Sequence, residues 1–169
     1  MVREAKAKAA SLMLAAGVIL LYFLGLEAEK YGLRVGAALF QRLTFHFFHA
    51  SFLHAALNAW VLLSVVFLFD ISIYPIITAF IIASSFPIDF LYDLMPCADT
   101  LLLPTVGLSG VCYALMGRIA FMVGKKWSYQ GWMAFYIGLG FVFPNMNGWI
   151  HLYCYLVGLF VGFLNKPLR

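Results

Sequence analysis

The feature that most restricts the fold of this chain is a series of six apolar runs that fill most of its 169 residues. Each run is long enough, or nearly so, to cross a membrane as a helix, which takes about 20 residues. Hydrophobic residues make up 64% of the chain and charged residues 11%, against about 25% charged residues in soluble domains. We therefore expect an all-α, polytopic membrane protein with a single domain over residues 1–169. The expected spans are 9–26, 51–69, 71–86, 107–124, 131–143 and 149–165.

The first run has the basic start and apolar middle of a secretory signal. It is followed by Glu27-Ala28-Glu29, which is a poor small-residue cleavage site. A retained helix is therefore favoured over a removed signal. Residues 27–50 are mixed in aromatic and basic character, and we expect them to form an outer loop that lies in the membrane interface.

If six helices cross the membrane and the amino terminus lies in the cytoplasm, most Lys and Arg residues fall on the cytoplasmic side, as is usual for membrane proteins. Eight of the eleven basic residues then lie inside, and five of the seven acids lie outside. The net charge of +4 is thus explained by topology, and nucleic-acid binding is not expected. We expect an integral membrane protein with both termini in the cytoplasm. The inner basic residues are Arg3, Lys6, Lys8, Arg118, Lys125, Lys126, Lys166 and Arg169, and the outer acids are Glu27, Glu29, Asp89, Asp93 and Asp99.

Polar side chains inside apolar runs are costly in a membrane and are therefore candidates for function. We measured their depth from the charged residue that ends each run, at a rise of about 1.5 Å per residue. Ser109 and His54 then lie about 24 Å from the cytoplasmic boundary, and His151 lies about 22 Å from it. Asn58 lies about 18 Å from the same boundary. Three helices are thus expected to bring polar groups to one layer, close enough to the outer face to hold water.

Spacing also predicts which way these groups face. His54 and Asn58 are four residues apart and share a helix face. Small residues on the Ser109 and His151 helices permit close contact between the two helices. We infer a Ser109–His151 dyad in which the neutral histidine takes the serine proton and later protonates the leaving amine. The small residues concerned are Gly110, Ala114, Gly117, Cys154, Gly158 and Gly162.

Two glycines flank the candidate serine in the sequence GLSG. Gly107 and Gly110 allow a tight turn and the approach of another chain. The start of a helix also offers backbone N–H groups and positive dipole character to an oxyanion formed at Ser109. His54 and Asn58 can donate further hydrogen bonds to that oxyanion. Taken alone, G-x-S-G is weak, because glycine and serine are common where membrane helices pack.

Together these motifs resemble those of the rhomboid family of intramembrane serine proteases, in its six-helix bacterial form. The segment 49–58, HASFLHAALN, is similar to the family motif H-x4-H-x3-N. The segment 107–117, GLSGVCYALMG, is similar to the nucleophile motif, and 151–158, HLYCYLVG, is similar to the motif that carries the histidine. The resemblance implies an endopeptidase that cleaves single-pass membrane proteins near the outer face. It implies Ser109 as nucleophile, His151 as base, His54 and Asn58 as oxyanion contacts, and Tyr113 as a ring packed against His151.

Three positions depart from the family pattern. Gln41-Arg42 stands where Trp-Arg is frequent, and its spacing to His49 is one residue short. Cys154 stands where a glycine is common, and Asn147-Gly148 lies one residue farther from His151 than in bacterial relatives. These departures concern the seating of the outer loop and the packing of the serine and histidine helices.

Other functions compete with proteolysis. A non-catalytic protein that binds helices, or a channel or transporter, would also place polar residues within the membrane. His46, His49 and His54 invite a metal site, but acids are absent nearby and the spacing matches no common zinc pattern. We expect no metal and no cofactor, an interfacial His46, and a His49 that holds the outer loop by hydrogen bonding. Cys97, Cys112 and Cys154 show no metal or redox spacing, and no disulfide is expected.

The fifth run carries aromatic residues that suggest a further role. Trp132, Phe135 and Tyr136 lie within one helical turn. We hypothesise that they form a gate through which a substrate helix enters from the lipid. The expected partners are the lipid bilayer and transmembrane substrates, and the sequence does not indicate the oligomeric state.

Overall fold

The structure is a computed structural model that describes residues 2–95, 99–143 and 146–165. Its described residues form helices and one isolated antiparallel bridge between Leu33 and Thr105. The expectation of an all-α fold is confirmed. The helices are α1 (Val2–Phe23), α2 (Ala28–Tyr31), α3 (Leu39–Thr44), η1 (Phe45–Phe47), α4 (Phe52–Leu68), α5 (Ile73–Ser84), α6 (Ile88–Leu94), η2 (Asp99–Leu101), α7 (Ser109–Ile119), α8 (Lys126–Val142) and α9 (Gly148–Leu164).

By length and composition, α1 is the one described helix that is able to cross a membrane by itself, over Glu4–Phe23. Two further crossings arise if the bent pairs α3–η1 with α4 and α5 with α6 each count as one span. Up to three apolar spans are thus present in the described part of the chain, against the six expected. The difference has a physical cause, because α7 has only 11 residues and α9 has 17, just short of a full span.

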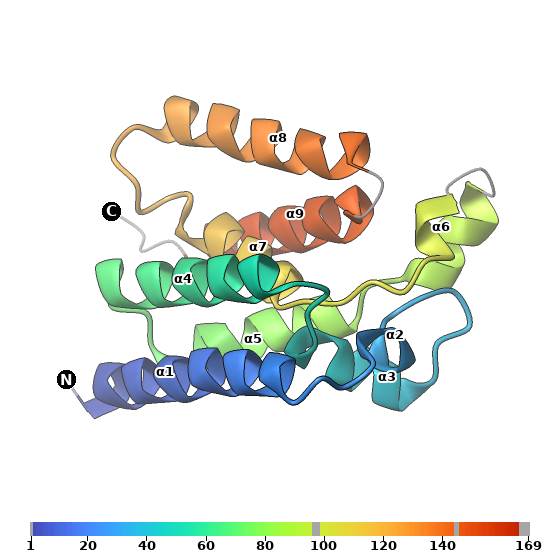
Figure 1. Cartoon of the computed structure of the whole chain (residues 1–169). Coiled ribbons are helices and arrows are strands. Elements are labelled where there is room, and N and C mark those ends of the chain that lie inside the picture. The colour runs from blue at the N-terminus through green and yellow to red at the C-terminus, as the bar shows by residue number, and fades with distance from the viewer. Residues whose placement is uncertain (1, 96–98, 144–145, 166–169) are drawn as a thin grey trace.

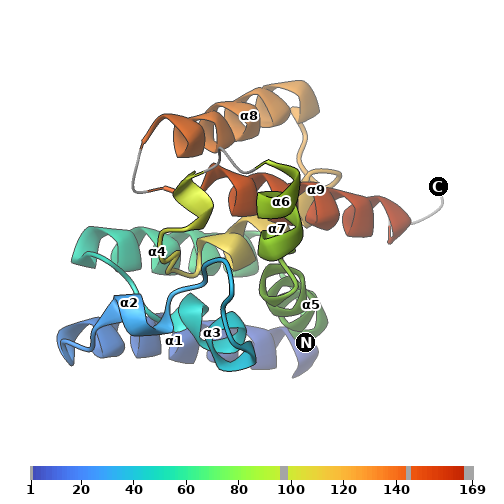
Figure 2. The same ribbon diagram turned by 90° about the vertical axis from the view of Figure 1, so that its right-hand side faces the viewer.

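Helix α7 lies at the centre and contacts α4, α5 and α9, while α8 packs against α9 on the outside (Figures 1 and 2). Helix α1 lies on the opposite side of the molecule, against α4 and α5. Val111 and Leu115 of α7 are fully buried between these neighbours. The central position of α7 brings Ser109, its first residue, next to the other candidate residues.

Three expected helix boundaries differ from the structure by five residues or more. The first helix starts at Val2 rather than at residue 9. Residues 107–124 were expected as one span, but α7 ends at Ile119. Its last turn tightens, because Ala120 N–H bonds the Gly117 carbonyl and the Tyr129 hydroxyl bonds the Met116 carbonyl. The next helix starts at Lys126, five residues earlier than expected. The ten rises of α7 supply about 15 Å of the roughly 24 Å expected between Ser109 and Lys125, so one helix does not cover that distance.

The contact between α7 and α9 is made by backbone. A Cβ added at Gly158 would overlap the Ala114 carbonyl oxygen, and one added at Gly117 would lie 2.7 Å from the Leu159 nitrogen. A Cβ at Gly110 would lie 3.1 Å from Ala83 Cβ of α5. Only glycine permits the two backbones to approach so closely at 117 and 158.

The outer loop is held by Arg42. Its Nη1 donates to the Phe86 carbonyl over 2.9 Å, and its Nη2 lies 2.5 Å from Asp89 Oδ2. Asp89 also accepts from Gly36 N–H over 2.7 Å. Gln41 caps α3 locally, where its Oε1 accepts from Ala38 N–H. The loop that departs from the family pattern is thus fixed to the start of α6.

The expectation of an interfacial His46 is wrong. His46 is fully buried in η1, and its Nε2 lies 2.9 Å from Ser84 Oγ of α5. Local sequence does not show this burial, because the imidazole is enclosed by the ring of Phe45 and by that of Phe80, which comes from α5. Burial lowers the pKa of His46 from 6.5 to about 3.

Candidate active site

Ser109 and His151 are in hydrogen-bonding contact. Ser109 Oγ, at the start of α7, lies 3.0 Å from His151 Nε2, on the first turn of α9. The serine is half-buried, whereas the histidine is 5% exposed. The two residues stand over forty positions apart, and the glycine-mediated contact of α7 with α9 brings them together.

The ring of Tyr113 supports the histidine. Tyr113 lies one turn after Ser109, and its ring stacks on the His151 imidazole with centroids 4.3 Å apart and planes at 21°. Such a contact restricts rotation of the imidazole. Gly140 of α8 lies on the other flank, where an added Cβ would be 3.2 Å from His151 Nδ1.

His54 and Asn58 of α4 approach the turn at Gly107 and Leu108, which we call the nucleophile turn after the role expected for Ser109. A Cβ placed on Gly107 would lie 2.7 Å from His54 Nε2 and 3.3 Å from Asn58 Nδ2. The two side chains therefore converge on the backbone just before Ser109. Gly107 has φ +120, a conformation that side chains rarely adopt, so glycine is required here for both space and backbone geometry.

The same turn is held on its other side by the outer loop. His49 Nε2 accepts a hydrogen bond from Leu108 N–H over 3.2 Å, and Gly107 N–H bonds the Phe45 carbonyl over 2.9 Å. His49 and His54 rings lie 5.0 Å apart, edge to face. His49 was expected to hold the outer loop by hydrogen bonding, and this bond ties that loop to the nucleophile turn.

Three polar atoms at the site are buried without a protein partner in the described part of the chain. They are Asn58 Nδ2, His151 Nδ1 and His49 Nδ1. Buried polar groups are bonded in most native structures, and exceptions occur at functional sites. An amide N–H that points toward the nucleophile turn and lacks a partner is a suitable donor for a ligand oxygen.

Asn147 was not identified as a site residue by sequence reasoning. Its Oδ1 accepts from Trp149 and Ile150 N–H and caps α9, while its Nδ2 donates to Thr105 Oγ1 over 2.8 Å. Thr105 also pairs with Leu33 through two backbone bonds of 2.8 Å. An asparagine just before an apolar helix is a capping signal and would have suggested the first half of this arrangement. The bond to Thr105 has no local sequence signal.

Cys154 fills the position where a glycine is common in the resembling family. It is fully buried on α9, and a Cβ added at Gly110 would lie 3.4 Å from its sulfur. The contact shows that Gly110 makes room for this larger side chain. Cys112 is also buried, and neither cysteine forms a disulfide. Cys97, Lys166 and Arg169 lie outside the described residues.

Within the described ranges, no group of three histidine, cysteine or acidic side chains is arranged to hold a metal ion. His46 bonds Ser84 of α5 rather than a candidate site residue. The candidate site therefore consists of a serine and a histidine in contact, a stacked tyrosine, and two side chains that meet at a strained glycine. No protein-family model, curated protein or solved structure matches the chain.

Proposed function

We propose that this chain is an intramembrane serine endopeptidase of the rhomboid type, with six membrane-spanning helices in a bacterial inner membrane. The observation that carries the proposal is the 3.0 Å contact between Ser109 Oγ and His151 Nε2. A serine hydroxyl becomes a nucleophile when a neutral imidazole accepts its proton, and this distance suits that transfer.

The proposed reaction begins when Ser109 Oγ attacks the carbonyl carbon of a substrate peptide bond. His151 Nε2 takes the hydroxyl proton, and the carbonyl oxygen becomes an oxyanion. Asn58 Nδ2 and His54 stabilise that oxyanion by hydrogen bonding, an effect worth roughly 3–4 kcal/mol per donor. The C–N bond then breaks, and His151 gives its proton to the leaving amine. Water hydrolyses the acyl-enzyme with the same histidine as base.

A dyad suffices for this proposal. No carboxylate contacts His151 in the described part of the chain, and Tyr113 holds the imidazole by stacking. The orientation that a carboxylate gives in other serine proteases is supplied here by the aromatic ring. We expect the substrates to be single-pass membrane proteins with the scissile bond near the outer face. Family habit suggests a small residue before that bond, and a helix-breaking glycine or proline nearby would free the backbone for attack.

A fluorophosphonate probe tests the proposal most directly. We expect the probe to label Ser109, as identified by peptide mass spectrometry, and labelling to disappear in Ser109→Ala and His151→Ala. The chain offers a matched control in its second serine–histidine pair, Ser84 with His46, at 2.9 Å. Ser84 is half-buried, as Ser109 is, so this control asks whether a serine–histidine contact is enough for labelling. Ser84→Ala should retain labelling, because the proposal places the nucleophile at Ser109.

Two results would redirect the assignment. Substrate binding without labelling, and unchanged by Ser109→Ala, indicates a non-catalytic helix-binding protein. Solute flux in liposomes that persists in Ser109→Ala indicates a channel or transporter. Either result, obtained with folded protein, overturns the protease proposal.

A further inference from the structure

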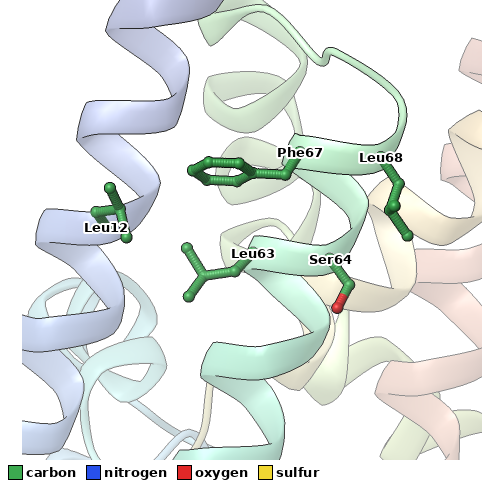
Figure 3. A pocket seen from close by; sticks show the side chains of 5 residues that line it. All are labelled: Leu12, Leu63, Ser64, Phe67 and Leu68. Carbon is green, nitrogen blue, oxygen red and sulfur yellow. The ribbon is translucent and has the colours of Figure 1, made fainter.

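A shallow groove runs between α1 and α4, away from the candidate active site (Figure 3). Its volume is about 420 Å³, within the range of small-molecule sites. The groove is open rather than enclosed. In Figure 3, Leu63 and Phe67 lie on the side of α4 that faces α1, whereas Ser64 and Leu68 lie on its other side. The lining of the groove is apolar except for one hydroxyl: Leu12, Leu63, Ser64, Phe67 and Leu68.

A pair of opposite charges lies at one end of this groove. Lys8 Nζ is 2.6 Å from Asp70 Oδ1 and lies 5.4 Å from the centroid of the Phe67 ring, which lines the groove. The lysine is one helical turn from Leu12, and the aspartate follows the end of α4. The Asp70 side chain is 64% exposed, so its carboxylate is open to a further partner.

Asp70 lies in a left-handed backbone conformation, which aspartate tolerates better than most other non-glycine residues. Its φ is +47, the one positive value at a non-glycine residue in the described part of the chain. Ile71 N–H bonds the Val66 carbonyl over 3.1 Å, which makes Asp70 the left-handed residue that ends α4, a place where glycine is usual. A carboxylate at this end also meets the negative pole of the helix dipole.

We propose that the groove binds a phospholipid with a zwitterionic, primary-amine headgroup, that is, a phosphatidylethanolamine. An acyl chain lies along the leucines and Phe67. The headgroup phosphate accepts hydrogen bonds from Lys8 Nζ, and its ammonium donates to the Asp70 carboxylate.

Charge complementarity selects this occupant. Lys8 and Asp70 present one cation and one anion side by side, which matches both charges of a zwitterion. An anionic headgroup would be repelled by Asp70, and a choline headgroup has no N–H with which to bond it. The apolar lining leaves nothing for a polar solute to bond except the Ser64 hydroxyl. The proposal goes beyond the protease function and does not depend on Ser109.

Native mass spectrometry of the full chain in detergent micelles tests the proposal. The probes are phosphatidylethanolamine, phosphatidylcholine and phosphatidylglycerol with identical acyl chains. We expect phosphatidylethanolamine to bind about tenfold more tightly than the other two, the effect of one charge-assisted hydrogen bond. Asp70→Asn should remove this preference while preserving the fold, because asparagine tolerates a left-handed conformation. Lys8→Gln should weaken binding of all three lipids.

A control and a mapping experiment complete the test. Glu27→Gln breaks a comparable exposed pair, with Lys30 at 2.8 Å, far from the groove, and should leave lipid binding unchanged. A phosphatidylethanolamine with a photoreactive group in its acyl chain should cross-link to peptides that contain Leu12 and Leu63. Tightest binding of phosphatidylglycerol, equal binding of all three lipids, or cross-links elsewhere would overturn the proposal. A dimer whose interface contains Leu12 and Leu63, and which does not dissociate when phosphatidylethanolamine is added, would overturn the proposal as well.

Discussion

The side-chain amide of Asn147 donates to Thr105 Oγ1 over 2.8 Å and so joins the start of α9 to the segment that leads into Ser109. Asn147 also caps α9, four residues before His151, through its Oδ1. One side chain therefore fixes the helix that carries His151, the proposed base, relative to the turn that precedes Ser109, the proposed nucleophile. Thr105 is in turn fixed by its backbone pairing with Leu33 of the outer loop.

This bond predicts a difference between two similar substitutions. Thr105→Val keeps the shape of the side chain and removes the acceptor, whereas Thr105→Ser keeps the acceptor. We expect Thr105→Val to lower kcat by roughly 10-fold or more, because small misplacements of reacting groups are costly. Thr105→Ser should stay near the parent rate. Cleavage of one substrate by both variants gives kcat and KM, and a change in KM alone would show that the bond does not position the dyad.

The Gly107 position gives a sharper steric prediction. Gly107→Ala would place a methyl group 2.7 Å from the His54 ring and force a side chain into φ +120. We expect cleavage and fluorophosphonate labelling to fall at least about 100-fold, as for loss of an oxyanion donor. Gly131→Ala on α8 is the matched control, because a Cβ there meets nothing within 4 Å. Equal activity of the two variants would exclude a role for the Gly107 turn.

Several elements of this site were predictable from the sequence because they depend on short, regular spacings. His54 and Asn58 share a face of α4, and Tyr113 follows Ser109 by one turn of α7, as helical periodicity requires. The glycines of α7 and α9 indicated a close helix contact, and an added Cβ at Gly117 or Gly158 would indeed meet backbone. Such features follow from a 3.6-residue repeat and from residue size.

Other elements were not predictable from local pattern. The end of α7 at Ile119 depends on Tyr129, which bonds the Met116 carbonyl from the next helix. The burial of His46 depends on Ser84, which is 38 residues away. In each case the helix end or the burial involves a hydrogen bond to a residue on another helix. Hydropathy along the chain does not indicate which residues of different helices will be partners.

Helix α8 leads to a prediction about substrate entry. It packs against α9, and its Trp132, Phe135 and Tyr136 side chains are 58%, 53% and 49% exposed. Their rings contact one another at 5.6–5.9 Å between centroids. A cluster of this kind on the outermost helix is suited to a gate that must shift before a transmembrane substrate enters.

Replacing Trp132 and Phe135 by alanine should therefore raise cleavage of a transmembrane substrate by about 2-fold to 10-fold, as expected when opening limits the rate. Labelling by the small fluorophosphonate should change little, because that probe needs no helix-sized opening. Trp127→Ala is the control on the same helix, since Trp127 is 91% exposed and lies at its first turn. An unchanged or lower cleavage rate in the folded double variant would contradict the gate.

His46 makes the stability of the fold depend on pH. In the folded protein burial lowers its pKa to about 3, whereas the unfolded chain titrates near the ordinary value of 6.5. Below about pH 6.5 the unfolded chain therefore binds a proton that folded His46 does not, and the unfolding free energy falls by up to about 1.4 kcal/mol per pH unit from this group. The stability of the folded protein is therefore unaffected by the titration of His46 above about pH 6.5, and it falls progressively as the pH is lowered from there toward pH 3.

His46→Gln should flatten this acid-side loss, because glutamine can still bond Ser84 and does not titrate. Thermal unfolding of both proteins in detergent micelles, followed from neutral pH to about pH 4, measures the difference in slope. Ser84→Ala is the informative companion, since it removes the 2.9 Å bond and leaves the imidazole in place. It should lower stability by about 1 kcal/mol at every pH and keep the slope. If the stability of His46→Gln and that of the parent fall in parallel with pH, His46 takes up its proton equally in the folded and unfolded states. That result would refute the burial of His46 as the source of the acid sensitivity.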